Sequence, residues 1–422
     1  MFKKIKISMK IVFVFTSCLL FLFFVVGLFY NPYGLQRNIF FAGMDDFLMD
    51  FFNVLRIIGD RNPYFNTVLD YGDKAYFPLT YMILYPFSQL DNFNAMTREE
   101  PWNSKMGLIS AFIFIGFIVF LLFLSLNNIC KKYLIPPPLI ISLVLSYIFF
   151  FSIERGNIII LAAAFIGFFI CYYDSENKHE RMFAVISLAF AATLKVYPVL
   201  LGFLYFEKKQ YREIFLSAII TLLLVFVPFL FFKGGFANIP KQISNIRLNT
   251  DSYNYTRLFQ RFSLAHLVFQ ISNLYSLSFS EKLILSLSKL AQVITYITSF
   301  VSILFSCLIK NKWVKISLLT MTIVFLPTNS GLYCGLYIFP MIILFFATIE
   351  ERSELFNVFT LIIFLIFLNP YQFVIKNKIS NYLLINIALL TFWLVLLIYS
   401  GKQIITFFKN NRKYQVLNET CV

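Results

Sequence analysis

The chain has 422 residues, of which 59% are hydrophobic and only 14% are charged. Soluble domains carry roughly 25% charged residues, and the mean hydropathy of +0.76 is typical of a protein whose solvent is lipid. Long unbroken apolar runs exclude a β-barrel, whose strands alternate and are only about 10 residues long. The composition predicts an all-α polytopic membrane protein in which the whole chain, 1–422, forms one membrane domain.

The net charge of +15 does not indicate a nucleic-acid partner. Most Lys and Arg residues stand in short loops between apolar segments, where basic residues set the orientation of a membrane protein. We therefore expect membrane lipids, and no nucleic acid, among the partners of this chain.

Cysteine and histidine give no sign of a metal centre or a cofactor. Two His residues in the whole chain exclude a His-rich metal site, and the six Cys lack disulfide or metal spacing. Most of the Cys lie in or beside apolar runs, where thiols behave as small hydrophobic groups. We expect no metal ligands and no cofactor, and the sequence leaves metal dependence open.

The N-terminal segment 1–10 carries four Lys and is expected to be cytoplasmic. The apolar run that follows, 11–30, is too long for the core of a cleaved signal peptide and is interpreted as an uncleaved first span. The segment 31–104 is then external. It is too long for a plain connector, so it is predicted to be a structured first external loop with re-entrant or interfacial helices.

A spanning helix needs about 20 mostly apolar residues. On that basis about 12 segments are expected: 11–30, 106–126, 139–152, 158–173, 183–194, 198–206, 214–232, 283–309, 316–326, 332–349, 356–368 and 382–399. This count puts a second long loop, 233–281, outside and a basic tail, 400–422, inside. The prediction is a plasma-membrane protein with both termini cytoplasmic.

The two segments 183–194 and 198–206 are predicted to be half-spans. A single helix here would place the basic sequence EKKQYR outside, against the charge rule. Pro198 disfavours a helical conformation at Tyr197, which favours a break near Lys195 at the external end. Broken helices at membrane depth are tolerated where they line a cavity.

The predicted external face collects the unusual polar residues of the chain. Charged residues at membrane depth are costly and usually mark function. They are Asp45, Asp46, Asp50, Arg56, Asp60, Arg61, Glu154, Arg155, Asn157, Lys195, Asn329 and Ser330.

Each of these groups has a functional and a structural interpretation. A carboxylate among Asp45, Asp46 and Asp50 can act as a general base, or it can cap the helix that begins near DFFNVLRII. Lys195 and Arg155 can hold a phosphate or reach toward lipid headgroups. Tyr76 and its aromatic neighbours can stack on a sugar or form an interfacial belt.

The order of four motifs resembles the GT-C glycosyltransferases, specifically the bacterial polyprenyl-phosphate-mannose-dependent mannosyltransferases of glycosyltransferase family 87. The motifs are Asp46-Phe47-Leu48-Met49-Asp50-Phe51 through Asn62-Pro63-Tyr64, then Tyr76-Phe77-Pro78-Leu79, then Arg155-Gly156-Asn157, and finally Ala191-Ala192-Thr193-Leu194-Lys195-Val196-Tyr197-Pro198. The chain departs from the family at Pro327-Thr328-Asn329-Ser330-Gly331-Leu332-Tyr333-Cys334, where members often have a His pair, and at the third motif, where members have Gln.

The resemblance implies a GT-C-like fold and an inverting hexosyltransferase, with mannose as the expected sugar. The donor would be a polyprenyl-phosphate-linked sugar, and a glycan or glycolipid would accept the sugar on the external face. The position of Asp46 implies the catalytic base, with Asp50 as the alternative. Lys195 and Arg155 are implied near the donor phosphate. The other motif residues implied in substrate binding are Asn157, Tyr76, Tyr197 and Tyr64.

Two other functions remain open from the sequence. A flippase or transporter for polyprenyl-linked glycans would also have about twelve spans, broken helices and buried cations. No inverted repeat is evident, and the long first loop exceeds what a transporter needs. A glycan polymerase or ligase would use the same lipid-linked substrates, but usually relies on external Arg and His.

Overall fold

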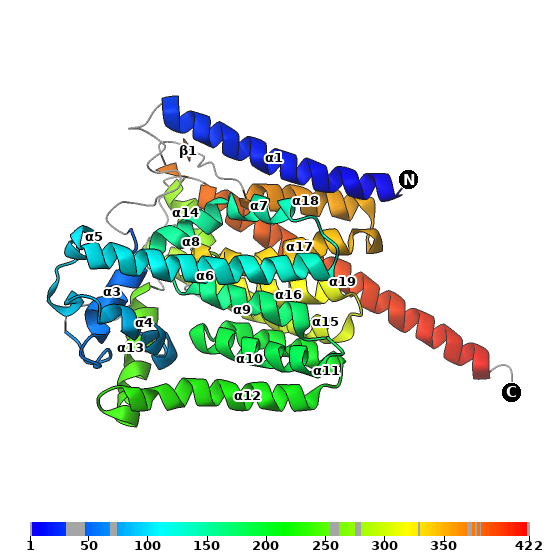
Figure 1. Ribbon diagram of the computed structural model, residues 1–422. Coiled ribbons are helices and arrows are strands. Elements are labelled where there is room, and N and C mark those ends of the chain that lie inside the picture. The colour runs from blue at the N-terminus through cyan, green and yellow to red at the C-terminus, as the bar shows by residue number, and fades with distance from the viewer. Residues whose placement is uncertain are drawn as a thin grey trace.

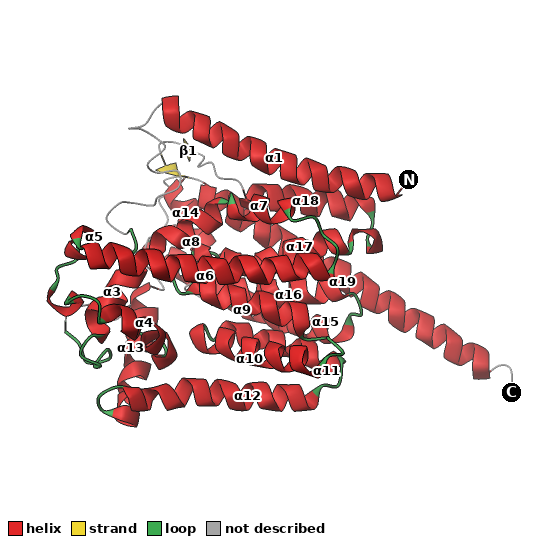
Figure 2. Ribbon diagram, in the orientation of Figure 1, coloured by secondary structure: helices red, strands yellow, loops and turns green. Residues whose placement is uncertain are grey.

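The computed structural model describes residues 2–30, 47–67, 74–253, 261–274, 280–327, 330–368, 374–375, 378–379 and 381–419. These residues are almost entirely helical, with one antiparallel pair of two-residue strands, β1 (Val374–Ile375) and β2 (Lys378–Ile379) (Figure 2). The all-α prediction is confirmed for this part of the chain.

The long helices lie roughly parallel or antiparallel in one bundle (Figure 1). The helices are α1 (Phe2–Tyr30), α3 (Met49–Ile58), α4 (Pro78–Ser88), α5 (Glu100–Asn103), α6 (Lys105–Lys132), α7 (Pro138–Val144), α8 (Tyr147–Arg155), α9 (Ile159–Tyr172), α10 (Lys178–Leu194), α11 (Phe203–Glu207), α12 (Tyr211–Phe226), α13 (Ile239–Tyr253), α14 (Leu264–Leu274), α15 (Glu281–Leu308), α16 (Lys312–Phe325), α17 (Phe339–Ala347), α18 (Glu354–Leu368) and α19 (Asn381–Glu419). Short 3₁₀ helices connect or extend them: η2 (Phe93–Ala95), η3 (Tyr197–Gly202), η4 (Val227–Phe231), η5 (Gly235–Asn238), η6 (Leu332–Ile338) and η7 (Ile349–Glu351).

Among the described residues, four helical segments are long and apolar enough to cross a membrane. They are Lys105–Lys132, Tyr211–Phe231, Lys282–Leu308 and Leu383–Lys409. The pair α7 and α8, bent by 56°, would be a fifth if it is one span. The predicted segment 11–30 lies within the 29-residue helix α1. The other predicted segments form shorter or broken helices, so the predicted count of 12 crossings stays a prediction.

The start of α1 and the end of α19 lie at the same end of the bundle, on the right of Figure 1. The helices α3, α4, α5 and α13, which come from the two predicted external loops, lie at the other end. We call these the terminal end and the loop end. This arrangement agrees with the prediction that both termini lie on one side, while the side that faces the cytoplasm remains a prediction.

The two long loops pack against each other at the loop end. The backbone N–H of Lys233 donates to the carbonyl of Arg61 at 2.9 Å, and Gln242 donates to the carbonyl of Tyr76 at 3.1 Å. Asn245, which is fully buried, donates to the carbonyl of Tyr64 at 3.2 Å. Segments about 170 residues apart in sequence thus form one structured cap on the bundle.

The predicted helix break at Lys195 is present. Helix α10 ends at Leu194, Lys195 has an extended backbone, and η3 starts at Tyr197 and packs against α10. Pro198 stands at the second position of η3, where a backbone N–H would have no partner within the helix, so its absence costs no hydrogen bond. The break places Lys195 at the end of α10 that is nearer the loop helices.

Helix α9 forms the centre of the bundle and packs against both α6 and α10. Most of its side chains are buried, and small residues let its neighbours approach closely. A Cβ at Gly167 would lie 2.6 Å from the hydroxyl oxygen of Ser125 on α6. The contact between α6 and α9 therefore depends on the absence of a side chain at Gly167.

An ionic cluster joins three segments at the terminal end. Asp174, just after α9, accepts from Lys132 of α6 at 2.9 Å and also pairs with Lys312 of α16. Lys312 donates to the Tyr133 hydroxyl at 2.6 Å and lies 4.8 Å from the centre of the Tyr173 ring. Burial alone would raise the pKa of Asp174, but the two ammonium groups outweigh it and hold the pKa below its ordinary value.

Gly167→Ala is expected to destabilise the protein by about 1–3 kcal/mol, because the added methyl group overpacks the contact with α6. Thermal unfolding in detergent measures the effect. Gly116→Ala on α6 is the control, since a Cβ there meets nothing within 4 Å. Adding Ser125→Ala should restore part of the loss. Equal effects of Gly167→Ala and Gly116→Ala would contradict the close contact.

Asp174→Asn is expected to lower the free energy of unfolding by about 1–3 kcal/mol at neutral pH, because the hydrogen bonds lose their charge. Because the folded pKa lies below the ordinary 3.8, the stabilisation is present above about pH 4 and is lost as the pH falls through the folded pKa. Unfolding midpoints of wild type and variant measured from pH 3 to 7 should therefore converge at the acid end. A difference between the two midpoints that stayed constant from pH 3 to 7 would refute the ionic contribution. Glu176→Gln, at an exposed position, serves as the control.

Candidate functional site

Asp50 lies in the first turn of α3 with both carboxylate oxygens engaged. Oδ1 accepts from the guanidinium of Arg155 at 2.5 Å, and Oδ2 accepts from the side-chain amide of Asn157 at 2.6 Å. The side chains of Asp50 and Arg155 are only 12% and 20% exposed. The cap of α3 is Leu48 and has no side-chain hydrogen bond, so Asp50 is held by the Arg155–Asn157 corner rather than used as a helix cap.

Arg155 and Asn157 are placed by the turn between α8 and α9. Helix α8 ends at Arg155 and is followed by Gly156, whose φ of +61° is the left-handed conformation that glycine adopts without strain. A Cβ there would come within 2.9 Å of the Phe51 Cβ on α3. Asn157 is buried, and its Oδ1 accepts at 2.9 Å from the N–H of Ile159, the first residue of α9, which fixes the amide toward Asp50.

Lys195 faces two aromatic rings beside this corner. Its Nζ lies 4.8 Å from the centre of the Tyr76 ring and 5.9 Å from that of Tyr333. The Asp50 carboxylate is close enough to interact electrostatically with the ammonium. The two rings offer the Lys195 side chain cation–π contact but no anionic partner.

Tyr333 connects Lys195 to the second long loop. Its ring stacks on Phe151 of α8, with centroids 6.2 Å apart. Residues 330 and 331 are pinned by backbone pairing: Arg261 bridges to Gly331, and the N–H of Phe262 donates to the carbonyl of Ser330 at 2.9 Å.

The structure brings together five of the residues that the sequence singled out. They are Asp50, Arg155, Asn157, Lys195 and Tyr76. Tyr197 lies at the start of η3 and is 38% exposed, whereas Tyr64 is fully buried between Tyr81 and Phe229. Asp46 lies outside the described residues, so its predicted role as the base stays a prediction.

Two participants were not singled out from the sequence. The segment containing Tyr333 was noted only because it lacks the expected His, and Arg261 lies in a loop with no recognisable motif. The sequence signal available for Tyr333 was its position after the break between two apolar helices, α16 and η6. Arg261, which is buried and contacts His266 Nε2 at 3.4 Å, is recognised only from the fold.

The arrangement combines a positioned carboxylate, a positioned amide and a cation at one end of the bundle. Such a site can orient a polar substrate and stabilise negative charge that develops on a leaving group. Among the described residues, no group of three or more His, Cys, Asp or Glu could hold a metal ion.

Gly156→Ala is expected to destabilise the protein by about 1–3 kcal/mol and to lower activity, because the methyl group would separate α8 from α3 and move Arg155 and Asn157. Gly235→Ala is the matched control, since Gly235 also has a positive φ, +53°, but a Cβ there meets nothing within 4 Å. Unfolding midpoints and activity would be compared for both. Indistinguishable variants would refute a specific requirement at Gly156.

Comparison with known proteins places the chain among membrane enzymes. The sequence profile of glycosyltransferase family 87 matches residues 76–327, which is more than half of the chain and includes Arg155, Asn157 and Lys195. A comparison with curated proteins gave no match. Together with the apolar helices, the profile identifies the protein as a multi-pass membrane glycosyltransferase that belongs to glycosyltransferase family 87.

Proposed function

We propose that this glycosyltransferase moves a hexose, with mannose as the first candidate, from a polyprenyl-phosphate donor to a glycan or glycolipid acceptor. In this proposal the reaction takes place at the external face of the plasma membrane, inverts the anomeric centre and uses an Asp as general base. The observation that supports it most is the clustering of Asp50, Arg155, Asn157 and Lys195 at the loop end of a family 87 chain.

Lys195 is the proposed partner of the donor phosphate. As the acceptor oxygen attacks the anomeric carbon, the bond from that carbon to the phosphate oxygen breaks and its electron pair moves to the phosphate. The ammonium offsets the charge that develops there, and such groups act most strongly where water is excluded. Tyr76, which contacts Lys195, would offer its ring to a sugar or an isoprenoid unit.

Arg155 is assigned a different role from the one that the resemblance implied. Its guanidinium is already paired with Asp50, so much of its charge is offset within the protein. We propose that Arg155 and Asn157 position Asp50 and shape the site, while Lys195 carries the phosphate.

Asp46 is the proposed general base, with Asp50 as the alternative. A base must reach the acceptor hydroxyl with a free lone pair. One lone pair on each oxygen of Asp50 already accepts a hydrogen bond, which favours a positioning role for this carboxylate.

Asp46→Asn is expected to lower kcat by about 10²–10⁴-fold, the usual contribution of a general base, with an unchanged unfolding midpoint. Asp50→Asn should lower both activity and the midpoint, because it removes the charge that pairs with Arg155. The assay uses purified protein, a polyprenyl-phosphate mannose donor and a panel of glycan acceptors.

The same pair of variants distinguishes the alternatives. A large loss of kcat in Asp50→Asn with an unchanged midpoint, together with an active Asp46→Asn, would assign the base to Asp50. If both variants kept full transfer activity, the carboxylate mechanism would be wrong. Transfer from a nucleotide sugar in place of the lipid-linked donor would refute the proposed donor class.

A further inference from the structure

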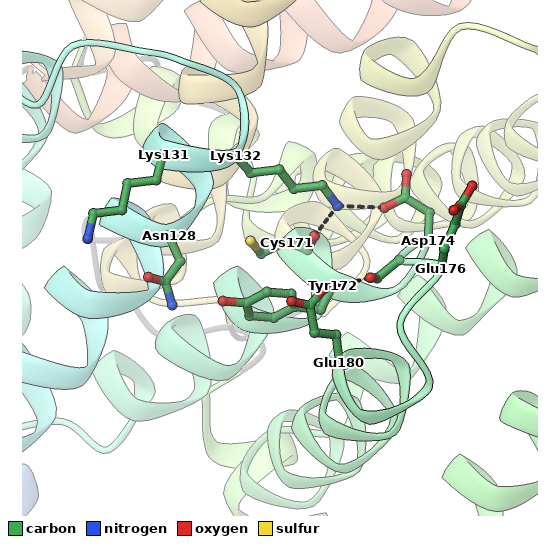
Figure 3. Close-up of a pocket in the computed structure, with 9 residues that line it drawn as sticks. Asn128, Lys131, Lys132, Cys171, Tyr172, Asp174, Glu176 and Glu180 are labelled. Carbon is green, nitrogen blue, oxygen red and sulfur yellow. Dashed lines mark hydrogen bonds and ion pairs between the residues drawn. The ribbon is translucent and has the colours of Figure 1, made fainter.

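A polar hollow lies at the terminal end of the bundle, far along α9 and α10 from Asp50 and Lys195. It has a volume of about 630 Å³. Residues from the end of α6, the end of α9, the turn after α9 and the start of α10 line it: Asn128, Lys131, Lys132, Cys171, Tyr172, Asp174, Ser175, Glu176 and Glu180 (Figure 3). The proposed transfer reaction makes no use of these residues.

Charges of both signs line this hollow. Lys132 and Asp174 pair with each other at 2.9 Å and are committed to the ionic cluster. Lys131, by contrast, is exposed and stands with Asn128 on one side of the Tyr172 ring, while Glu180 lies across the ring on α10 (Figure 3). A ligand with an anionic group and a nearby cationic group could pair its anion with Lys131 and its cation with Glu180.

An apolar strip leads away from the hollow along the bundle. On the central helix α9, Phe165, Phe168 and Tyr172 share one face at spacings of three and four residues. On α10, Phe183 contacts Phe168 at 5.2 Å and Tyr172 at 5.9 Å between ring centroids, and is 39% exposed.

The strip continues on both neighbouring helices toward the loop end. Phe190 of α10 stacks on Phe165 with centroids 5.0 Å apart, and both rings are partly exposed. On α6, Leu121 and Leu124 precede Asn128 at helical spacing and are also partly exposed. Because α9 packs against both α6 and α10, these residues form a strip with α9 as its floor.

We propose that the hollow and this strip together bind a membrane phospholipid whose headgroup carries both a phosphate and a primary ammonium, such as phosphatidylethanolamine. Lys131 and Asn128 bind the phosphate, Glu180 accepts from the ammonium, and one acyl chain lies along the aromatic strip. Charge complementarity argues for this occupant: an anionic lipid would leave Glu180 unmatched, and a quaternary ammonium could not donate a hydrogen bond to it.

A lipid bound at this site would contact helices that extend to Asn157 and Lys195 at the loop end. Helix α9 begins just after Asn157, and α10 ends just before Lys195. A lipid that contacts α6, α9 and α10 would fix the two helices that present these residues. The inference goes beyond the proposed function and does not depend on which sugar or acceptor is used.

The test measures the unfolding midpoint of delipidated protein in detergent while dioleoyl-phosphatidylethanolamine, -phosphatidylglycerol or -phosphatidylcholine is titrated in. Wild type should respond to the ethanolamine lipid at about tenfold lower concentration than to the other two, which corresponds to about 1.4 kcal/mol. Equal responses to all three lipids would refute recognition of the headgroup.

Three variants separate the contributions. Glu180→Gln keeps an acceptor for the Ser175 hydroxyl but should abolish the preference for the ethanolamine lipid. Lys131→Gln should weaken the response to all three lipids. Phe183→Ala leaves every charge in place and should also weaken all three. Lys105→Gln, at the other end of α6, is the matched control and should behave as wild type.

A soluble headgroup completes the design. Phosphoethanolamine without acyl chains should not raise the midpoint at millimolar concentration, because the apolar strip supplies most of the binding free energy. Stabilisation by the free headgroup equal to that by the lipid would refute the acyl-chain part of the site. Persistence of the ethanolamine preference in Glu180→Gln would overturn the proposal as a whole.

Discussion

The charged hydrogen bonds around Asp50 are the constraint on which the loop end depends. A carboxylate that is only 12% exposed is costly unless its charge is matched, and here a guanidinium and an amide from one turn match it. These bonds join α3, which follows the first predicted span, to the corner between α8 and α9. The backbone adds to the same junction, because the N–H of Leu48 donates to the carbonyl of Glu154 at 2.5 Å.

The rest of the site follows from that junction. Gly156 ends α8, and the turn of residues 156–158 leads into α9, so Arg155 at the end of α8 and Asn157 in the turn donate to the same carboxylate. Tyr333 stacks on Phe151 of α8 and thereby extends the cluster to Lys195, directly after α10. A shift of α8 would therefore disturb the carboxylate and the cation together.

The sequence predicts the helices better than it predicts the site. Apolar run length locates most of the described bundle helices, and Pro198 with the charge rule locates the break at Lys195. Run length does not determine how many helices cross the membrane, because α9, α16 and α17 are short and almost wholly buried by other helices. The ordered motifs include Asp50, Arg155, Asn157 and Lys195, but pairings across about 105 residues, such as Asp50 with Arg155, depend on tertiary packing.

Helices α9 and α10 have a different group of polar residues at each end. At the loop end, Asn157 and Lys195 stand where a helix begins or stops, and short polar turns there replace a longer hydrophobic span. At the terminal end, Asp174 is secured by Lys132 and Lys312, which leaves the neighbouring charges on α6 and α10 directed into a hollow that opens along an aromatic strip. Rigid secondary elements can carry coupling between distant sites, and the hollow is lined from α9 and α10, the helices that begin after Asn157 and end before Lys195.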